Sequence, residues 1–201
     1  MNRKKFILSG ALTAFAMTTH GAVIRNADGL FVGDCDTTND ILGPFYRPDA
    51  PLRKDMTYEG LKGTRITIQG KVFKSDCVTA ISGAMVEIWH CDTEGAYDND
   101  SAAFRQRARW ITNEQGEYAF TTIFPGKYLN GELYRPAHIH YRVTEKDSKE
   151  LVSQLYFKGD PHITKDPWAS SEKAKQRVLE ITPEDVHGNL TVHFDIYLQQ
   201  K

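Results

Sequence analysis

From residue 65 onward, hydrophobic residues alternate with polar ones in short runs, a pattern typical of half-buried β-strands. The clearest run lies at 84–89, where Ala84, Val86 and Ile88 alternate with Met85 and Glu87. Comparable runs lie at 65–73, 117–123, 137–143, 151–157 and 190–198. Clusters of Gly, Asn, Asp and Pro, typical of turns, separate these runs. The pattern therefore predicts six or more short strands.

A single segment, residues 169–180, has a helical pattern. Many short strands with one short helix predict an all-β fold, an antiparallel sandwich or barrel. Residues 23–60 contain three prolines and several Asp and Asn residues, and they show no sustained period of 3.6 or 2. We therefore expect an irregular N-terminal arm at 23–60, followed by a β-sandwich core at 61–201.

The first 22 residues have the pattern of a secretory signal peptide. Three basic residues at 3–5 precede a short apolar stretch at 6–17, and small residues follow. The apolar stretch is short for a bilayer span, so we expect a cleaved leader at 1–22 and no stable membrane association. The predicted location is outside the cytoplasm, either periplasmic or secreted. A buried N-terminal helix is the alternative interpretation.

Composition and charge exclude several classes of protein. Hydrophobic residues make up 40% of the chain and charged residues 25%, which excludes disordered, collagen-like and multi-span membrane chains. The net charge is -1, and loss of the three basic leader residues makes it -4. Without a basic excess, nucleic acid is not an expected partner. The sequence does not decide the oligomeric state, and a homo-oligomer is left open.

Three cysteines remain after the expected leader, and an oxidising compartment would allow one disulfide. Cys77 and Cys91 flank a turn and would lie several residues out of register in a regular hairpin. Disulfide geometry disfavours that pair. We therefore expect Cys35 to pair with one of the other two, and three unpaired buried thiols are the alternative.

The run at 135–140 contains two histidines separated by one residue. Successive side chains of a strand point to opposite faces, so His138 and His140 share a face, with ring nitrogens roughly 6–7 Å apart, suited to one metal ion. Alone this pair has modest specificity, since core and surface histidines are common. No Cys, Asp or Glu accompanies it at conventional zinc spacing, but Tyr97 and Tyr128 lie upstream.

With these two tyrosines, the chain resembles the intradiol ring-cleaving dioxygenases, the non-haem ferric enzymes that include catechol and protocatechuate dioxygenases. The motifs that carry the resemblance occur in order at 42–46, 83–84, 89–97, 112–118, Tyr128, 135–140 and 154–157. They cover most of the chain after the leader. The resemblance implies a prealbumin-like antiparallel β-sandwich and a single dioxygenase domain over residues 23–201.

The resemblance also implies an iron site built from two tyrosines and two histidines. The positions that match the family's ligands are Tyr97, Tyr128, His138 and His140. Arg135 and Gln154 match residues that lie beside the substrate in the family. The ligand chemistry is consistent, because a phenol of pKa about 10 gives up its proton at neutral pH only to a strongly charged cation. Phenolate oxygen is a hard ligand and selects Fe(III) over zinc.

The implied activity is cleavage of a catecholic ring by O2, giving a cis,cis-muconate-type product. The ring is of the catechol, protocatechuate or hydroxyquinol type. Tyr128, the expected axial ligand, would leave the metal when substrate binds and would then act as a base. Arg135 would stabilise negative charge on the ring, and Gln154 would orient that guanidinium or the substrate. Residues 44–46 are expected to contribute to the pocket wall.

The chain departs from the family pattern in three places. The connection from Tyr128 to His138 is only ten residues long, which predicts a more open site. Arg107 and Ala108 stand where the family has an Arg-Gly pair, so the local turn geometry is an open question. A long helical N-terminal region of the catechol-enzyme type is missing, which favours the compact protocatechuate type of architecture.

Other interpretations of the same residues are weaker. A cupin-type metal dioxygenase would use Glu145 with the two histidines, but no second cupin motif follows. A prealbumin-like or carboxypeptidase-regulatory-like binding module without catalysis explains the scaffold, but has no need of the Arg, His and Gln residues together. Tyr97 and Tyr128 would then be ordinary core residues. His90, next to a tryptophan, is expected to pack or to form hydrogen bonds rather than to bind metal.

Overall fold

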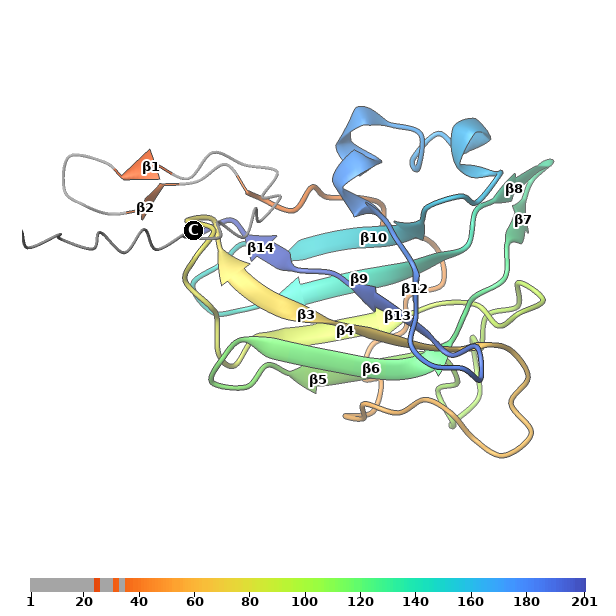
Figure 1. Cartoon of the computed structure of the whole chain (residues 1–201). Helices are drawn as coiled ribbons and strands as arrows, with labels where there is room; N and C mark the ends of the chain where they lie inside the picture. Colours follow the sequence, from red (N-terminus) through yellow and green to blue (C-terminus); the bar gives the residue numbers. More distant parts are fainter. Residues whose placement is uncertain (1–23, 26–30, 33–34) are drawn as a thin grey trace, which may run out of the picture.

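Two β-sheets pack face to face and enclose the hydrophobic core (Figure 1). The computed structural model describes residues 24–25, 31–32 and 35–201, so the expected leader at 1–22 lies outside the described residues. The predicted all-β sandwich is confirmed.

The first sheet has five strands in the order β11-β10-β9-β4-β5. Their bounds are Met85–Trp89 for β4, Arg107–Ile111 for β5, His138–Thr144 for β9, Leu151–Phe157 for β10 and Val178–Leu179 for β11. All pairings are antiparallel except β10 with β11, which is parallel. The central strand β9 carries both candidate histidines.

The second sheet is built on the long strand β3, Arg65–Lys74. Strand β6, Glu117–Ile123, pairs with one edge of β3 in antiparallel orientation. On the other edge, β13 and then β14 pair with β3 in parallel orientation. The bounds are Leu190–His193 for β13 and Ile196–Leu198 for β14, and β12, Thr182–Pro183, pairs with β13. The antiparallel pattern expected from sequence therefore holds for most of the sandwich, but not for these C-terminal strands.

The strand predicted over 190–198 is interrupted at Phe194 and Asp195. The amide of Phe194 donates to the Gln69 carbonyl (2.9 Å), and the Asp195 carboxylate accepts from the Lys71 amide (2.8 Å). A Cβ atom at Gly70 would lie 2.0 Å from the Phe194 carbonyl oxygen. The interruption thus depends on a close backbone approach that only glycine at position 70 permits.

Short elements complete the chain. The pairs are β1 (Ile24–Arg25) with β2 (Phe31–Val32), and β7 (Tyr128–Asn130) with β8 (Leu133–Arg135). Two 3-10 helices follow β10, η1 at Ile163–Lys165 and η2 at Glu172–Arg177. The helix predicted at 169–180 is therefore helical over six residues only, and the chain then enters β11.

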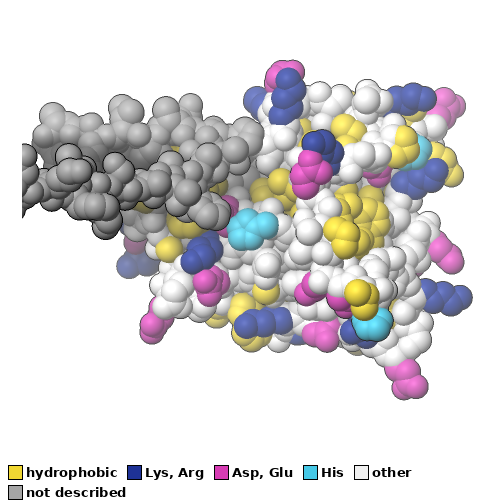
Figure 2. Space-filling model, viewed as in Figure 1, with side chains coloured by type: hydrophobic (Ala, Val, Ile, Leu, Met, Phe, Trp, Pro, Cys, Tyr) yellow, Lys and Arg dark blue, Asp and Glu magenta, His cyan; other side chains and the backbone are white. Residues whose placement is uncertain are grey.

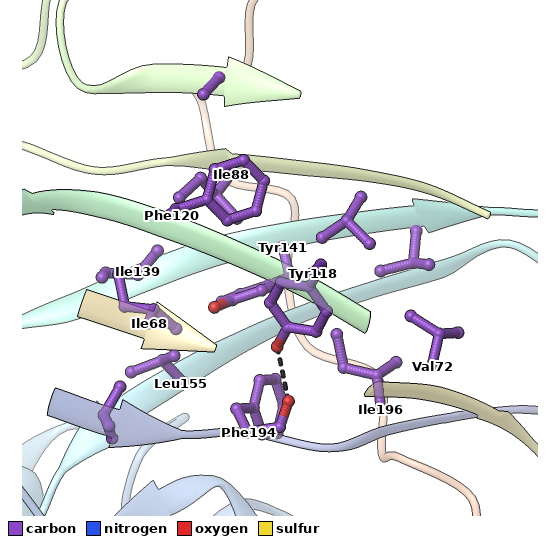
Figure 3. Packing of buried hydrophobic residues seen from close by; sticks show 14 of the residues in the cluster. Ile68, Val72, Ile88, Tyr118, Phe120, Ile139, Tyr141, Leu155, Phe194 and Ile196 are labelled. Carbon is purple, nitrogen blue, oxygen red and sulfur yellow. Dashed lines mark hydrogen bonds between the residues drawn. The ribbon is translucent and has the colours of Figure 1, made fainter. Parts of the chain in front are cut away.

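The core lies between the sheets, where alternate residues of each strand meet (Figure 3). On β9, Ile139, Tyr141 and Val143 are fully buried in this core. Because successive side chains of a strand alternate, His138 and His140 project from the opposite face of the first sheet. Both histidines are nevertheless buried, so other parts of the chain must cover that outer face.

Residues 35–60 provide part of this cover. Their backbone bonds to both sheets, for example from Asp40 to the Val152 carbonyl (2.8 Å) and from Met56 to the Thr121 carbonyl (2.9 Å). A disulfide joins Cys35 to Cys77, with the two Cα atoms 5.6 Å apart. This confirms that Cys35 pairs with one of the other cysteines, and Cys91 is buried and free.

Charges of both signs are interspersed on the described part of the face shown in Figure 2. Among the residues that the structure describes, no helix is long and apolar enough to cross a membrane.

Candidate functional site

Four aromatic rings meet on the outer face of the first sheet, and they are the four predicted ligand residues. Tyr97 and Tyr128 lie edge to face with ring centroids 5.7 Å apart, and Tyr128 lies 5.7 Å from His138. The ring centroids of His138 and His140 are 4.9 Å apart, and those of His140 and Tyr97 are 6.2 Å apart. The structure therefore brings together residues that are up to 43 positions apart in a single cluster, in which the two histidines are buried and the two tyrosines half-buried.

Two interlocked turns bring the tyrosines together. Tyr97 follows a turn after β4, and Tyr128 begins β7. A Cβ atom at Gly95, where φ is +89°, would lie 2.5 Å from the Lys127 carbonyl oxygen, and one at Gly126 would lie 2.4 Å from the carbonyl oxygen of Thr93. Glycine at these positions allows the two backbones to touch. The segments that carry the two phenols are thus fixed against each other.

The imidazole of His138 is oriented by the backbone. Its Nδ1 donates to the Pro136 carbonyl (2.7 Å), which leaves Nε2 with a free lone pair. That Nε2 lies 3.4 Å from the Tyr97 hydroxyl. A histidine held in this way presents one nitrogen to the centre of the cluster, as a metal ligand requires.

The imidazole of His140 is fixed by packing. Its ring stacks on Trp89, its cross-strand neighbour on β4, with centroids 4.8 Å apart and planes 7° apart. On another side Gly43 leaves only enough room for a hydrogen, because a Cβ atom there would lie 3.1 Å from His140 Cε1. Its Nδ1 is buried and has no hydrogen-bond partner among the described residues.

Burial sets the protonation of this cluster. Burial and the positive charge of Arg135 lower the pKa of His138 to about 3, and burial with the neighbouring His138 lowers the pKa of His140 well below its usual value. Burial, with Cys91 and Tyr128 nearby, raises the pKa of Tyr97 well above its usual value. At neutral pH the imidazoles are therefore neutral, and ionisation of Tyr97 requires a cation.

Arg135 and Gln154, predicted to lie beside the substrate, lie next to each other. Nη2 of Arg135 donates to Oε1 of Gln154 (3.1 Å) and to the Tyr156 hydroxyl (3.3 Å). Nε2 of Gln154 donates to the Ile41 carbonyl (2.8 Å). Because both ends of the Gln154 amide are bonded to protein, its contacts indicate that it orients the guanidinium.

Two buried ion pairs surround this contact. Arg135 Nε donates to the Asp166 carboxylate (2.7 Å), and Arg177 Nη1 donates to the Asp40 carboxylate (2.6 Å). The Tyr156 hydroxyl connects the pairs, because it donates to Asp40 (2.9 Å) and accepts from Arg135. These partners were not among the residues predicted from the sequence. The only sequence signal was the position of Tyr156, two residues after Gln154 on β10.

The N-terminal arm closes the cluster from outside. The ring of Phe45 stacks on Tyr97 at 4.3 Å and lies edge-on to Tyr128 at 5.8 Å. The guanidinium of Arg107 donates to the carbonyls of Phe45 (2.5 Å) and Asp98 (2.7 Å), which ties the arm to the loop after Tyr97. Ala108, which replaces the family's glycine, lies fully buried within β5 opposite Ile88 and not in a turn.

The residues of the alternative interpretations lie elsewhere or have other partners. His90 is buried and bonds to the Cys91 carbonyl (2.7 Å) and the Thr122 hydroxyl (2.9 Å), as expected for a packing histidine. Glu145 lies in the turn after β9 and accepts from Ser148 Oγ (2.7 Å). Within the described part of the chain, no three His, Cys, Asp or Glu residues are grouped to hold a metal ion. The tyrosines therefore distinguish this cluster from a cupin or zinc site.

Comparison with known proteins gives a consistent answer. A family model described as Dioxygenase matches residues 41–200. The chain is 31% identical over 189 residues to chlorocatechol 1,2-dioxygenase of Rhodococcus opacus, across 81% of this chain and 72% of that protein. It is 31% identical over 185 residues to the protocatechuate 3,4-dioxygenase beta chain of Burkholderia cepacia, across 80% and 78%.

A solved structure is also similar. It is the dioxygenase domain of a dioxygenase carbohydrate-binding protein fusion from Streptomyces sp. SirexAA-E, with TM-score 0.72 and 28% identity over 83% of this chain and 99% of that chain. Three other curated relatives are longer proteins, and the matched part spans 50%, 60% and 57% of their lengths.

Proposed function

This chain belongs to the intradiol ring-cleaving dioxygenases, a family of oxidoreductases, and we propose that it cleaves a catecholic ring between its two hydroxylated carbons with O2. The proposed cofactor is Fe(III), and the proposed ligands are Tyr97, Tyr128, His138 and His140. The observation that supports the proposal is that the rings of these four residues lie next to one another over the outer face of the first sheet.

The residues fit a ferric ion. Two phenols and two neutral imidazoles are suitable donors for a hard trivalent cation. Nε2 of His138 faces the Tyr97 hydroxyl, and Nδ1 of His140 has no hydrogen-bond partner among the described residues. Burial keeps the Tyr97 phenol protonated in the absence of a cation, so a bound cation would relieve an otherwise unfavourable ionisation. When bound, the ferric ion would stabilise both phenolates, hold the two catecholate oxygens and promote the reaction of the ring with O2.

The protein's own groups then have distinct roles. Tyr128 is proposed to accept a proton from a catechol hydroxyl at its phenolate oxygen. Arg135 supplies a buried positive charge beside the reacting ring and stabilises the negative charge that develops there. Gln154 keeps that guanidinium in place through the 3.1 Å hydrogen bond. Phe45, stacked on Tyr97, shields the site from water on the side of the arm.

The first test is the visible spectrum of the iron-loaded protein. We expect one iron per chain and a reddish-brown tyrosinate-to-iron absorption that is lost or strongly shifted in Tyr97→Phe. Tyr58→Phe serves as the control, because Tyr58 is exposed and outside the cluster. A colourless protein after loading, or colour that survives in both variants, would rule out the proposed ligand set.

The second test is turnover. Oxygen uptake with catechol, protocatechuate and hydroxyquinol would rank the three substrate types. Incorporation of both atoms from 18O2 into a ring-opened diacid would establish intradiol dioxygenation. A coloured, iron-loaded protein that consumes no oxygen with any of the three would retain the metal site but contradict the catecholic substrate.

We also propose that the protein is exported, into a periplasm or out of the cell. The Cys35–Cys77 disulfide supports this location, because disulfides persist mainly in oxidising compartments. Fusion of residues 1–30 to a reporter enzyme that is active only after export would test the proposal, with Lys4 and Lys5 changed to Glu as the export-deficient control.

A further inference from the structure

The guanidinium of Arg135 has one donor group that the protein does not use. Its Nε is bonded to Asp166 Oδ2, and its Nη2 to Gln154, to Tyr156 and, at 3.5 Å, to Asp166 Oδ1. Its Nη1 is buried and has no hydrogen-bond partner among the described residues. A buried donor without a partner is costly, so an arrangement that leaves one open needs a reason.

The position of this donor relates to the ligand cluster. Arg135 is the cross-strand partner of Tyr128 in the β7–β8 hairpin. Its Nη2 donates to Gln154 and Tyr156, which are the cross-strand partners of His140 and His138 on β10. The guanidinium therefore lies beside the cluster at which the catecholate would bind.

One carboxylate fixes this arginine and its surroundings. Asp166 is 2% exposed, and its Oδ2 accepts from Arg135 Nε at 2.7 Å. Its Oδ1 accepts from the backbone amides of Trp168 (3.0 Å) and Ala169 (2.7 Å). The ring of Trp168 in turn covers the guanidinium, with Cζ 4.5 Å from the ring centroid. Asp166 thus holds both the cation and the aromatic side chain that covers it.

We propose that Asp166 is a positioning residue for ring cleavage: it orients Arg135 so that Nη1 remains free for an anionic oxygen of the bound catecholate. This inference rests on the proposed function. An unrestrained arginine would have to be ordered when substrate binds, whereas here the protein has ordered it beforehand. The carboxylate also neutralises the guanidinium, so the unliganded site does not contain an unpaired buried charge.

The substitution Asp166→Asn separates this role from a merely structural one. The asparagine Oδ1 can still accept from the two loop amides, but its NH2 group would face the N–H of Arg135, donor against donor. The comparison variant is Asp40→Asn, which weakens the other buried ion pair of the same region and is linked to Arg135 indirectly, through the Tyr156 hydroxyl. The side chains of both pairs are 1–2% exposed, so the two variants remove equally buried charges.

The decisive measurement is a double-variant cycle with Arg135→Gln, assayed as kcat/KM for oxygen uptake with the substrate that wild type uses best. We expect D166N to lower kcat/KM about 10- to 100-fold in the wild-type background. In the R135Q background the same change should lower it less than about twofold, because its effect is transmitted through the arginine. D40N should lower the melting temperature comparably and kcat/KM less than about threefold. Equal factors for D166N in both backgrounds, or equal factors for D166N and D40N, would overturn the proposal.

Two features keep the test decisive if D166N alone folds poorly. The double variant R135Q/D166N contains no buried charge at this position. Comparison of its kcat/KM with that of R135Q still measures the coupling between Asp166 and Arg135. Independently of activity, the Arg135 Nε–H should give a slowly exchanging side-chain signal in 15N NMR spectra, absent from R135Q. We expect D166N to lose this signal and D40N to keep it, and the opposite pattern would contradict the proposal. Absence of turnover by wild-type protein would reject the proposed function, whereas the NMR comparison would still decide whether Asp166 orders Arg135.

Discussion

Tyr128 and Arg135 are cross-strand partners at the open end of the β7–β8 hairpin. One residue is a proposed metal ligand and the other a proposed substrate contact, so a single backbone register sets the spacing between metal and substrate charge. Because register in a hairpin is fixed by its turn, the turn at residues 131–132 controls geometry at the site. Gly131 adopts φ +65° there, a conformation that favours glycine.

Gly43 gives a prediction about the fit around His140. Both Gly43 (φ +73°) and Gly60 (φ +81°) have left-handed backbone, so alanine at either position costs about 1 kcal/mol of stability. Only at Gly43 would the new Cβ contact a proposed ligand, at 3.1 Å from His140 Cε1, since nothing lies within 4 Å of a Cβ at Gly60. We expect Gly43→Ala to lower kcat/KM about 3- to 10-fold and Gly60→Ala to change it less than twofold. Similar kinetic effects of the two variants would contradict the prediction.

The disulfide should stabilise the fold by anchoring the arm. It closes a sequence separation of 42 residues, for which the chain-entropy model gives about 4 kcal/mol, the upper end of the typical range of about 2–4 kcal/mol. We therefore expect Cys35→Ser/Cys77→Ser to lower the free energy of unfolding in urea by that amount, and a reductant to have the same effect on wild type. Cys91→Ser should retain the sensitivity to reductant, because Cys91 is not part of the bridge. A reductant effect on the double variant as large as that on wild type would contradict this account.

Because the pKa of His90 is lowered in the folded protein, we expect the protein to lose stability in mild acid. Burial lowers its pKa to about 4 in the folded protein, against about 6.5 in the unfolded chain. Between these values the unfolded state binds more protons, so stability rises with pH and is lost as pH falls from 6.5 toward 4. Linkage gives about 2 kcal/mol of lost stability at pH 5 relative to pH 7 from this one group.

The prediction for His90 is measured by urea unfolding of metal-free protein at pH 7 and pH 5. His90→Gln keeps a polar side chain beside Thr122 but has no proton to gain. We expect the wild type to lose about 2 kcal/mol more than His90→Gln over this interval. An equal loss in both proteins would show that other groups, such as His138 and His140, account for the acid sensitivity.

A substitution at Tyr118 should lower the stability of the protein without lowering its activity. Its hydroxyl donates to the Phe194 carbonyl (2.6 Å) within the core between the sheets (Figure 3), whereas the two histidines of the site project from the opposite face of the first sheet. Tyr118→Phe leaves that buried carbonyl without this donor, and we expect a loss of about 1–3 kcal/mol in unfolding free energy. kcat/KM should stay within about twofold of wild type. Tyr58→Phe, at an exposed tyrosine, should change neither quantity, and a comparable stability loss there would refute the explanation.

The sequence predicted best the strands whose hydrophobic runs are bounded by polar or turn residues. The predicted runs at 117–123 and 151–157 have the same bounds as β6 and β10. Strand β5 was missed because its sequence begins with an arginine, and Arg107 is buried only through its bonds to distant carbonyls. The β7–β8 hairpin was missed although Asn130 and Gly131 form a typical tight-turn pair, because exposed leucines obscure the alternation around it.

The residues of the candidate site were likewise predicted from the sequence only in part. The two histidines could be placed on one face from strand geometry, and family resemblance added the tyrosines, Arg135 and Gln154. The structure brings all six into one region. The supporting ion pairs were out of reach, because Asp40 and Arg177 are 137 residues apart and nothing local marks either carboxylate or guanidinium as buried. A charged side chain is buried only where the fold places a partner beside it. The local sequence pattern does not show which distant residue that partner is.

The parallel pairing of β3 with β14 affects the order in which the molecule can be made. Lys71 and Asp195, which bond where the two strands meet, are 124 residues apart. The strand on which the second sheet is built is therefore synthesised long before β13 and β14, which pair with one of its edges. Until then, one edge of β3 is unpaired, and an unpaired edge invites association with other chains.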